Sequence, residues 1–99
     1  MRLLYTEQAL ISLNEALDLI TPKVSPQKLL EIRNRILDTA DSLLQQPLKG
    51  RKEPLLEQLR LNHRRLVVGR YKIIYRIVGD CIYITDIFDS RQHPDKMKG

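Results

Sequence analysis

Residues 66–88 read LVVGRYKIIYRIVGDCIYITDIF, and they carry the strongest structural signal in the chain. It contains three runs rich in β-branched and aromatic residues, the types that favour β-strands, at 66–68, 71–78 and 81–88. Two dipeptides separate the runs, Gly69-Arg70 and Gly79-Asp80, and each has the length of a tight hairpin turn. The stretch therefore predicts an antiparallel meander of three strands.

The first half of the chain predicts a short strand followed by two helices. Residues 1–5 (MRLLY) form an apolar run, and Thr6 can cap a helix that stops near Thr21-Pro22. A second helix begins at Ser25, with Pro26 in its first turn, and ends before Pro47. Because the connection between them is short, the helices should lie antiparallel as a hairpin.

Residues 48–58 mix glycine, proline and charged residues, and we interpret them as a loop or an irregular turn. The order of elements is then β-α-α-β-β-β. The sequence predicts an α+β fold in which an N-terminal helical hairpin packs on a small, mostly antiparallel sheet. Ninety-nine residues correspond to one domain, residues 1–99, with no linker.

The strand register predicts which side chains share a face of the sheet. A two-residue turn at 69–70 pairs Val68 with Tyr71, and one at 79–80 pairs Val78 with Cys81. One face is then apolar and can accept the helices; it carries Leu66, Val68, Tyr71, Ile73, Tyr75, Ile77, Ile82 and Ile84. The opposite face should be a basic, concave surface that carries His63, Arg65, Lys72, Arg76, Tyr83 and Thr85, with Arg91 near its end beyond Ile87 and Asp89.

The charge of the chain is concentrated in its middle. The whole protein carries a formal net charge of +5. Residues 49–76 contain nine basic and two acidic side chains, a net charge of +7, whereas the flanking segments are each −1. Such a cluster indicates a surface for nucleic acid or for an acidic protein, although a solvated, solubilising face would have the same composition.

Several classes of protein receive no support from the sequence. No stretch is long and apolar enough to cross a bilayer, and the N-terminus lacks the pattern of a secretory signal, so we expect a cytoplasmic protein. The single cysteine, Cys81, lies in an apolar run and is expected to be a buried structural thiol. No metal site is expected, because the histidines and the cysteine lack ligand spacing, and no phosphate-binding loop or other cofactor motif occurs.

The segment LVVGRYKIIYRIVGDCIYITDIFDSRQHP resembles the C-terminal half of toxins of the RelE/ParE superfamily. The preceding strand and helical hairpin match the order of elements in that family, so the resemblance spans nearly the whole chain. It implies a growth-inhibiting toxin of a type II toxin–antitoxin system, associated with plasmid stabilisation. It also implies a cognate antitoxin partner whose C-terminal segment wraps the helices and the sheet.

The superfamily has two kinds of target, and the sequence bears on both. ParE-like members inhibit DNA gyrase, and for this function the target-binding residues would be Arg65, Lys72, Arg76, Tyr83 and Arg91. RelE-like members cut mRNA on the ribosome without a metal, and by position the catalytic candidates would be His63, Arg65, Lys72, Arg91 and His93. Cleavage needs a base, an acid and cations around the phosphate.

The tail separates these two hypotheses. The nucleases commonly follow the residue equivalent to Arg91 with a tyrosine, whereas the segment from Gln92 to Met97 contains none. We therefore favour an inhibitor of gyrase, with a ribosome-dependent mRNA endonuclease as the alternative, and whether the protein is an enzyme stays open. An inert relative that only binds its antitoxin is the third hypothesis.

Overall fold

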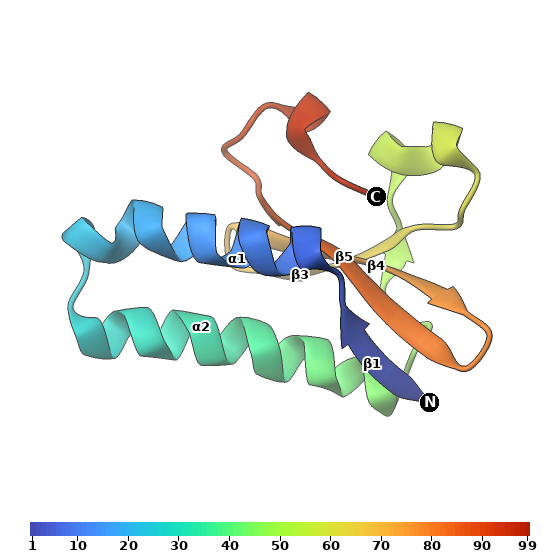
Figure 1. Ribbon diagram of the computed structural model, residues 1–99, viewed down its shortest axis with the longest axis horizontal. Helices are drawn as coiled ribbons and strands as arrows, with labels where there is room; N and C mark the ends of the chain where they lie inside the picture. Colours follow the sequence, from blue (N-terminus) through green and yellow to red (C-terminus); the bar gives the residue numbers. More distant parts are fainter.

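The computed structural model describes residues 1–99, and local side chains determine where its two long helices begin. Helix α1 (Glu7–Ile20) is capped by Thr6, whose Oγ1 accepts a hydrogen bond from the Ala9 amide at 3.1 Å. Helix α2 (Pro26–Asp41) is capped in the same way by Ser25. The short 3-10 turn η1 (Thr21–Lys23) joins them, and the predicted helical hairpin is confirmed (Figure 1). Neither helix has the length and apolar character needed to cross a membrane.

The sheet has five strands in the order β1-β5-β4-β3-β2. Their bounds are β1 (Arg2–Tyr5), β2 (Arg51–Lys52), β3 (Arg64–Val68), β4 (Tyr71–Val78) and β5 (Cys81–Asp89). Strand β1 pairs parallel with β5, and every other pair is antiparallel. Both predicted hairpin turns form, and Gly69 and Gly79 adopt the left-handed backbone that these turns require. The predicted α+β fold is confirmed.

The segment 48–58 is more regular than the sequence predicts. It contains strand β2, which extends the sheet, and the 3-10 helix η3 (Pro54–Leu59). A tertiary contact explains the difference: the buried Tyr75 hydroxyl donates to the Pro47 carbonyl at 2.8 Å and accepts from the Gly50 amide at 3.0 Å. These bonds hold the chain against the core just before it pairs with β3.

A β-bulge changes the face on which the end of β5 presents its side chains. Tyr75 pairs with Ile84 but Ile74 pairs with Asp86, so Thr85 is an extra residue in β5. The expected alternation therefore holds up to Ile84 and is reversed beyond it. Ile87, predicted on the basic face, instead belongs to the core cluster beneath the helices.

The sheet consequently has an apolar cluster on each side. The larger core, of 15 buried residues, lies between the sheet and the two helices. The smaller one, on the opposite side, consists of Leu56, Ile74, Phe88 and Met97. Figure 1 shows η3 and the C-terminal segment next to each other, across the sheet from α2. The second face of the sheet is therefore covered in its centre.

Candidate functional site

The basic face exists, and the strand register builds it. Arg76 is paired with Tyr83, and Lys72 is paired with Phe88, whose ring lies in the smaller cluster away from the helices. Arg65 is paired with Ile74, another member of that cluster. Paired residues share a face, so the predicted side for Arg65, Lys72, Arg76 and Tyr83 is confirmed. All four are partly exposed.

The face is not the open surface that the sequence predicts. Leu56 of η3 and Met97 of the C-terminal segment cover its centre. Thr85 is buried there, with its hydroxyl 3.5 Å from the Lys98 carbonyl. Only the two long helices were predicted to cover the sheet, because a 3-10 helix and a short tail have no periodicity that would indicate their position.

Glu53 neutralises part of the positive charge on this face. Its side chain is fully buried, and Oε1 lies 3.3 Å from Lys72 Nζ and 3.9 Å from Arg65 Nε. Its other oxygen, Oε2, accepts from the Leu55 amide at 3.1 Å and so caps η3. Lys72 and Arg65 are therefore partly occupied by an internal ion pair. Glu53 was not predicted as a site residue; its one signal in the sequence is an acidic residue before Pro54 in a strongly basic segment.

His63, predicted on the basic face, is buried, with only 3 % of the residue exposed. Its Nε2 lies 3.1 Å from the Gly99 carbonyl oxygen, a contact that holds the C-terminal segment on the sheet. Burial lowers the pKa of His63 below the ordinary value of 6.5, and the positive charge of Arg76 acts in the same direction, while the Gly99 contact partly opposes both. The imidazole is thus a neutral structural group.

The pKa of His63 predicts how stability depends on pH. Because the folded protein holds a proton on His63 less readily than the unfolded chain, stability should fall as the pH decreases through 6.5 toward the lower pKa of the folded state. We expect the free energy of unfolding, measured with urea, to fall more between pH 7.5 and pH 5.5 in the wild type than in His63→Gln. Equal losses in the two proteins would contradict this assignment.

Arg91 does not join the basic face. Its Nη2 lies 2.7 Å from Oδ2 of the buried Asp89, which is paired with Tyr71 on the side of the helices. Burial alone would raise the pKa of Asp89, but the hydrogen bonds and charge of Arg91 outweigh it and lower this pKa. The prediction that Arg91 lies near the end of the basic face is wrong, because the bulge at Thr85 reverses the alternation before Asp89.

Neither His93 nor Cys81 lies in a cleft as a reactive group would. The exposed His93 caps the short 3-10 turn η4 (Pro94–Lys96), because its Nδ1 accepts from the Asp95 amide at 3.1 Å. The structural role of His93 is therefore that of a turn residue. Cys81 was predicted to be buried and is instead partly exposed, because it begins β5 at the end of the sheet.

Asp86 is a buried acid that the sequence did not reveal. Only 2 % of the residue is exposed, and Oδ2 accepts from the Lys98 amide at 2.9 Å. Burial raises the pKa of Asp86, while hydrogen bonding with Ser12 and the Lys98 and Ile87 amides partly opposes the rise. Together with His63, this residue ties the C-terminal segment across the sheet. The bulge at Thr85 sets its position in the sheet, where it is paired with Ile74.

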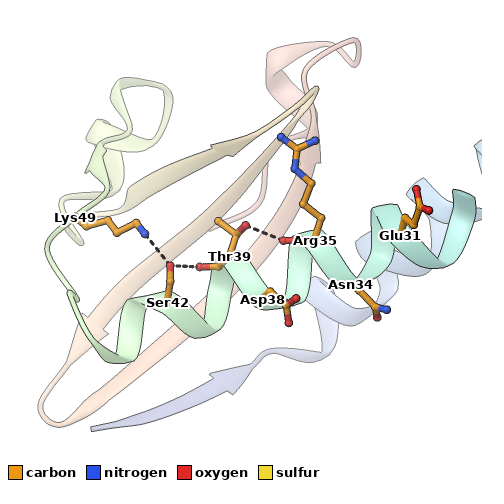
Figure 2. Close-up of a pocket in the computed structure, with 7 residues that line it drawn as sticks. All are labelled: Glu31, Asn34, Arg35, Asp38, Thr39, Ser42 and Lys49. Carbon is orange, nitrogen blue, oxygen red and sulfur yellow. Dashed lines mark hydrogen bonds between the residues drawn. The ribbon is translucent and has the colours of Figure 1, made fainter.

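Two hollows lie on the side of the helices. The first, shown in Figure 2, runs along α2 and is polar throughout; its side chains bond within it, with Lys49 Nζ donating to Ser42 Oγ at 2.9 Å and Thr39 Oγ1 donating to the Arg35 carbonyl at 2.7 Å. The second is a groove between the helical hairpin and the β3–β4 turn. It has an apolar floor and three basic residues, and it is lined by Ile20, Val24, Lys28, Ile32, Arg35, Ile36, Val68, Gly69, Arg70 and Tyr71.

The helical hairpin, the five-stranded sheet and the basic face define a small α+β protein. The sequence profile described as the ParE toxin of the type II toxin-antitoxin system parDE matches residues 3–94, so the chain belongs to the ParE toxin family. It is the toxin component of a type II toxin–antitoxin pair.

Comparison with solved structures agrees with the fold. One chain, described as the chromosomal ParDE TA system from P. aeruginosa, superposes with a TM-score of 0.75 at 23% sequence identity. The alignment covers 90% of this chain and 95% of that chain. A search of curated proteins finds no match.

Proposed function

We propose that the protein arrests growth by binding and inhibiting DNA gyrase, rather than by cutting RNA. The observation that carries the proposal is the separation of the candidate acid–base groups. His63 is buried against the Gly99 carbonyl, Arg91 is paired with Asp89 on the other side of the sheet, and His93 caps an exposed turn. In-line cleavage of RNA would need such groups around one phosphate.

A binding inhibitor needs a rigid surface instead, and the sheet supplies one. Arg76 and Tyr83 are directly paired across β4 and β5, and both stay partly exposed beside the segment that covers the centre of the face. Arg76 Nε is buried without a hydrogen-bond partner inside the protein. Arginine and tyrosine are enriched among the residues that dominate protein interfaces, so this pair is the proposed contact with gyrase.

A supercoiling assay with purified gyrase tests the proposal. The wild-type protein is expected to block supercoiling or to trap a cleaved gyrase–DNA complex. Truncating an interface anchor costs about 1–2 kcal/mol, so Arg76→Ala and Tyr83→Ala should each raise the concentration needed for inhibition about tenfold. Arg33→Ala, at an exposed position on α2, removes the same charge and should inhibit like the wild type.

Three outcomes would count against this function. Failure of the wild-type protein to inhibit or trap gyrase would exclude the proposed target. Codon-positioned cuts in translated mRNA, seen by primer extension and lost in Arg65→Ala, would favour the endonuclease. Growth without arrest after induced expression would identify an inert relative. Since gyrase and the ribosome both work in the cytoplasm, we place the protein there.

The groove between the helical hairpin and the β3–β4 turn is the proposed site for the antitoxin. Its apolar floor suits one face of an amphipathic segment, and Lys28, Arg35 and Arg70 suit acidic residues along the edge of that segment. Antitoxin added to the gyrase assay should restore supercoiling. It should no longer do so for the double variant Arg35→Glu and Arg70→Glu, and undiminished rescue of that variant would place the antitoxin elsewhere.

A further inference from the structure

The edge of the sheet formed by β2 and β3 brings like charges together. Arg51 is paired directly with Arg65, and Lys52 directly with Arg64. Like charges opposite one another on neighbouring strands destabilise a sheet. Both residue pairs of this short ladder are therefore unfavourable in the isolated protein, and a bound anion would relieve the repulsion.

Most of these cations have no acidic partner. Arg64 Nη1 donates to the Gly50 carbonyl at 2.7 Å, and Lys52 Nζ donates to Asn62 Oδ1 at 2.9 Å. Lys49, just before β2, bonds to the Ser42 hydroxyl. These acceptors are neutral and leave the charges uncompensated. Glu53 is the one acid in contact with the ladder, at 3.9 Å from Arg65, and it also faces Lys72.

Three of these five cations border a hollow on the surface. It is lined by Lys49, Gly50, Arg51, Arg65, Leu66 and Val67. Lys49 and Arg51 are exposed, so their side chains are free to meet a ligand from solution. The backbone of Gly50 forms part of the hollow. A side chain at this position would collide with the Tyr75 hydroxyl and the Arg65 carbonyl. We call Lys49, Arg51, Lys52, Arg64 and Arg65 the basic edge.

We propose that the basic edge binds the sugar-phosphate backbone of duplex DNA. Four of the five cations have no acidic partner, and such a cluster suits a regular polyanion. Contacts of this kind position a protein on DNA without reading its sequence. The choice of DNA rests on the proposed function, because a protein bound to gyrase lies beside the duplex that gyrase holds. The toxin would thus contact gyrase through Arg76 and Tyr83 and contact DNA through the basic edge.

Fluorescence anisotropy with a labelled 20-base-pair duplex of arbitrary sequence tests the proposal on the full chain. Affinity should fall with salt, and three to four phosphate contacts would give a log–log slope of about −3. The double variant Lys49→Glu and Arg51→Glu should bind at least about tenfold more weakly at 0.1 M salt. Its matched control, Lys23→Glu and Arg33→Glu, makes the same change in net charge at exposed positions in the helical hairpin and should retain most of the affinity.

Thermal unfolding shows whether a variant binds DNA more weakly merely because it is unfolded. Arg51→Glu places a carboxylate opposite Arg65 and converts a repulsive pair into an attractive one, so this variant should melt at or above the temperature of the wild type while binding DNA more weakly. Retained affinity in a folded Arg51→Glu protein would overturn the proposal. Equal weakening in the two double variants would also overturn it, since net charge alone would then account for binding.

Competition and low-salt binding distinguish a DNA surface from an RNA surface and from a merely protective row of charges. If single-stranded RNA competes more than tenfold better than the duplex, the basic edge is an RNA surface and the proposal fails. If no binding occurs at low salt, the charges only protect the sheet edge from aggregation, and the proposal fails as well. The supercoiling assay gives a separate result. If Arg76→Ala no longer inhibits gyrase but still binds DNA, the protein has two binding surfaces, as proposed. If the wild-type protein binds DNA but does not inhibit gyrase, only the proposed function is contradicted.

Discussion

Replacing Tyr75 with alanine is expected to lower the free energy of unfolding by about 3–5 kcal/mol. The side chain is completely buried in the larger core, so its removal leaves a cavity the size of an aromatic ring. The change also deprives the Pro47 carbonyl and the Gly50 amide of their hydrogen-bond partner. Urea unfolding followed by circular dichroism measures this loss.

Tyr75→Phe separates the ring from the hydroxyl. The phenylalanine ring fills the same space, so only the two hydrogen bonds are lost, and we expect a cost of about 1–3 kcal/mol. Because those bonds hold the start of β2 in place, this variant should also weaken DNA binding by the basic edge. If Tyr75→Phe were as stable as the wild type, the hydroxyl would not be holding residues 47–50.

Replacing Phe88 with alanine is expected to cost about 3 kcal/mol and to release the C-terminal segment. Phe88 is 3 % exposed and packs with Leu56, Ile74 and Met97 on the face away from the long helices. Without the ring, Met97 loses its packing partner, so the tail should detach before the rest of the protein unfolds. Native-state hydrogen exchange should show loss of protection at the Lys98 amide, which donates to Asp86.

A control on the neighbouring surface makes this result specific. Val67 is 65 % exposed on β3, and Val67→Ala should change stability by less than about 0.5 kcal/mol. If Phe88→Ala left the Lys98 amide protected and instead loosened α1 and α2, then Phe88 would belong to the larger core. The bulge at Thr85 would then be absent.

Much of the fold was predictable because its signals are local. Thr6 and Ser25 cap the helices they precede, and Gly69 and Gly79 sit in the turns they were expected to form. Short turns also fix the register of the strands they join, so the pairs Val68–Tyr71 and Arg76–Tyr83 followed from the sequence. The side of the sheet that carries Arg65, Lys72 and Arg76 followed in turn.

The features that could not be predicted depend on distant contacts. The bulge at Thr85 has no glycine or other marker, yet it moves Ile87 to the face opposite to the one expected and leaves Phe88 on the face away from the helices. The cover of the basic face depends on Met97 meeting Leu56, residues 41 positions apart in the chain. His63 is buried beside Gly99, a residue 36 positions away in the chain.

The class of fold, the order of its elements and the concentration of positive charge between residues 49 and 76 all follow from the order of the amino acids. Caps, turns and alternation act over a few residues, which is why these features can be read without coordinates. Which cations lack an acidic partner depends instead on the three-dimensional fold. Glu53 is buried between Lys72 and Arg65, and Arg91 is paired with Asp89, whereas Arg51, Lys52 and Arg64 at the edge of the sheet have no acidic partner. Ion pairing depends on side chains that folding brings together.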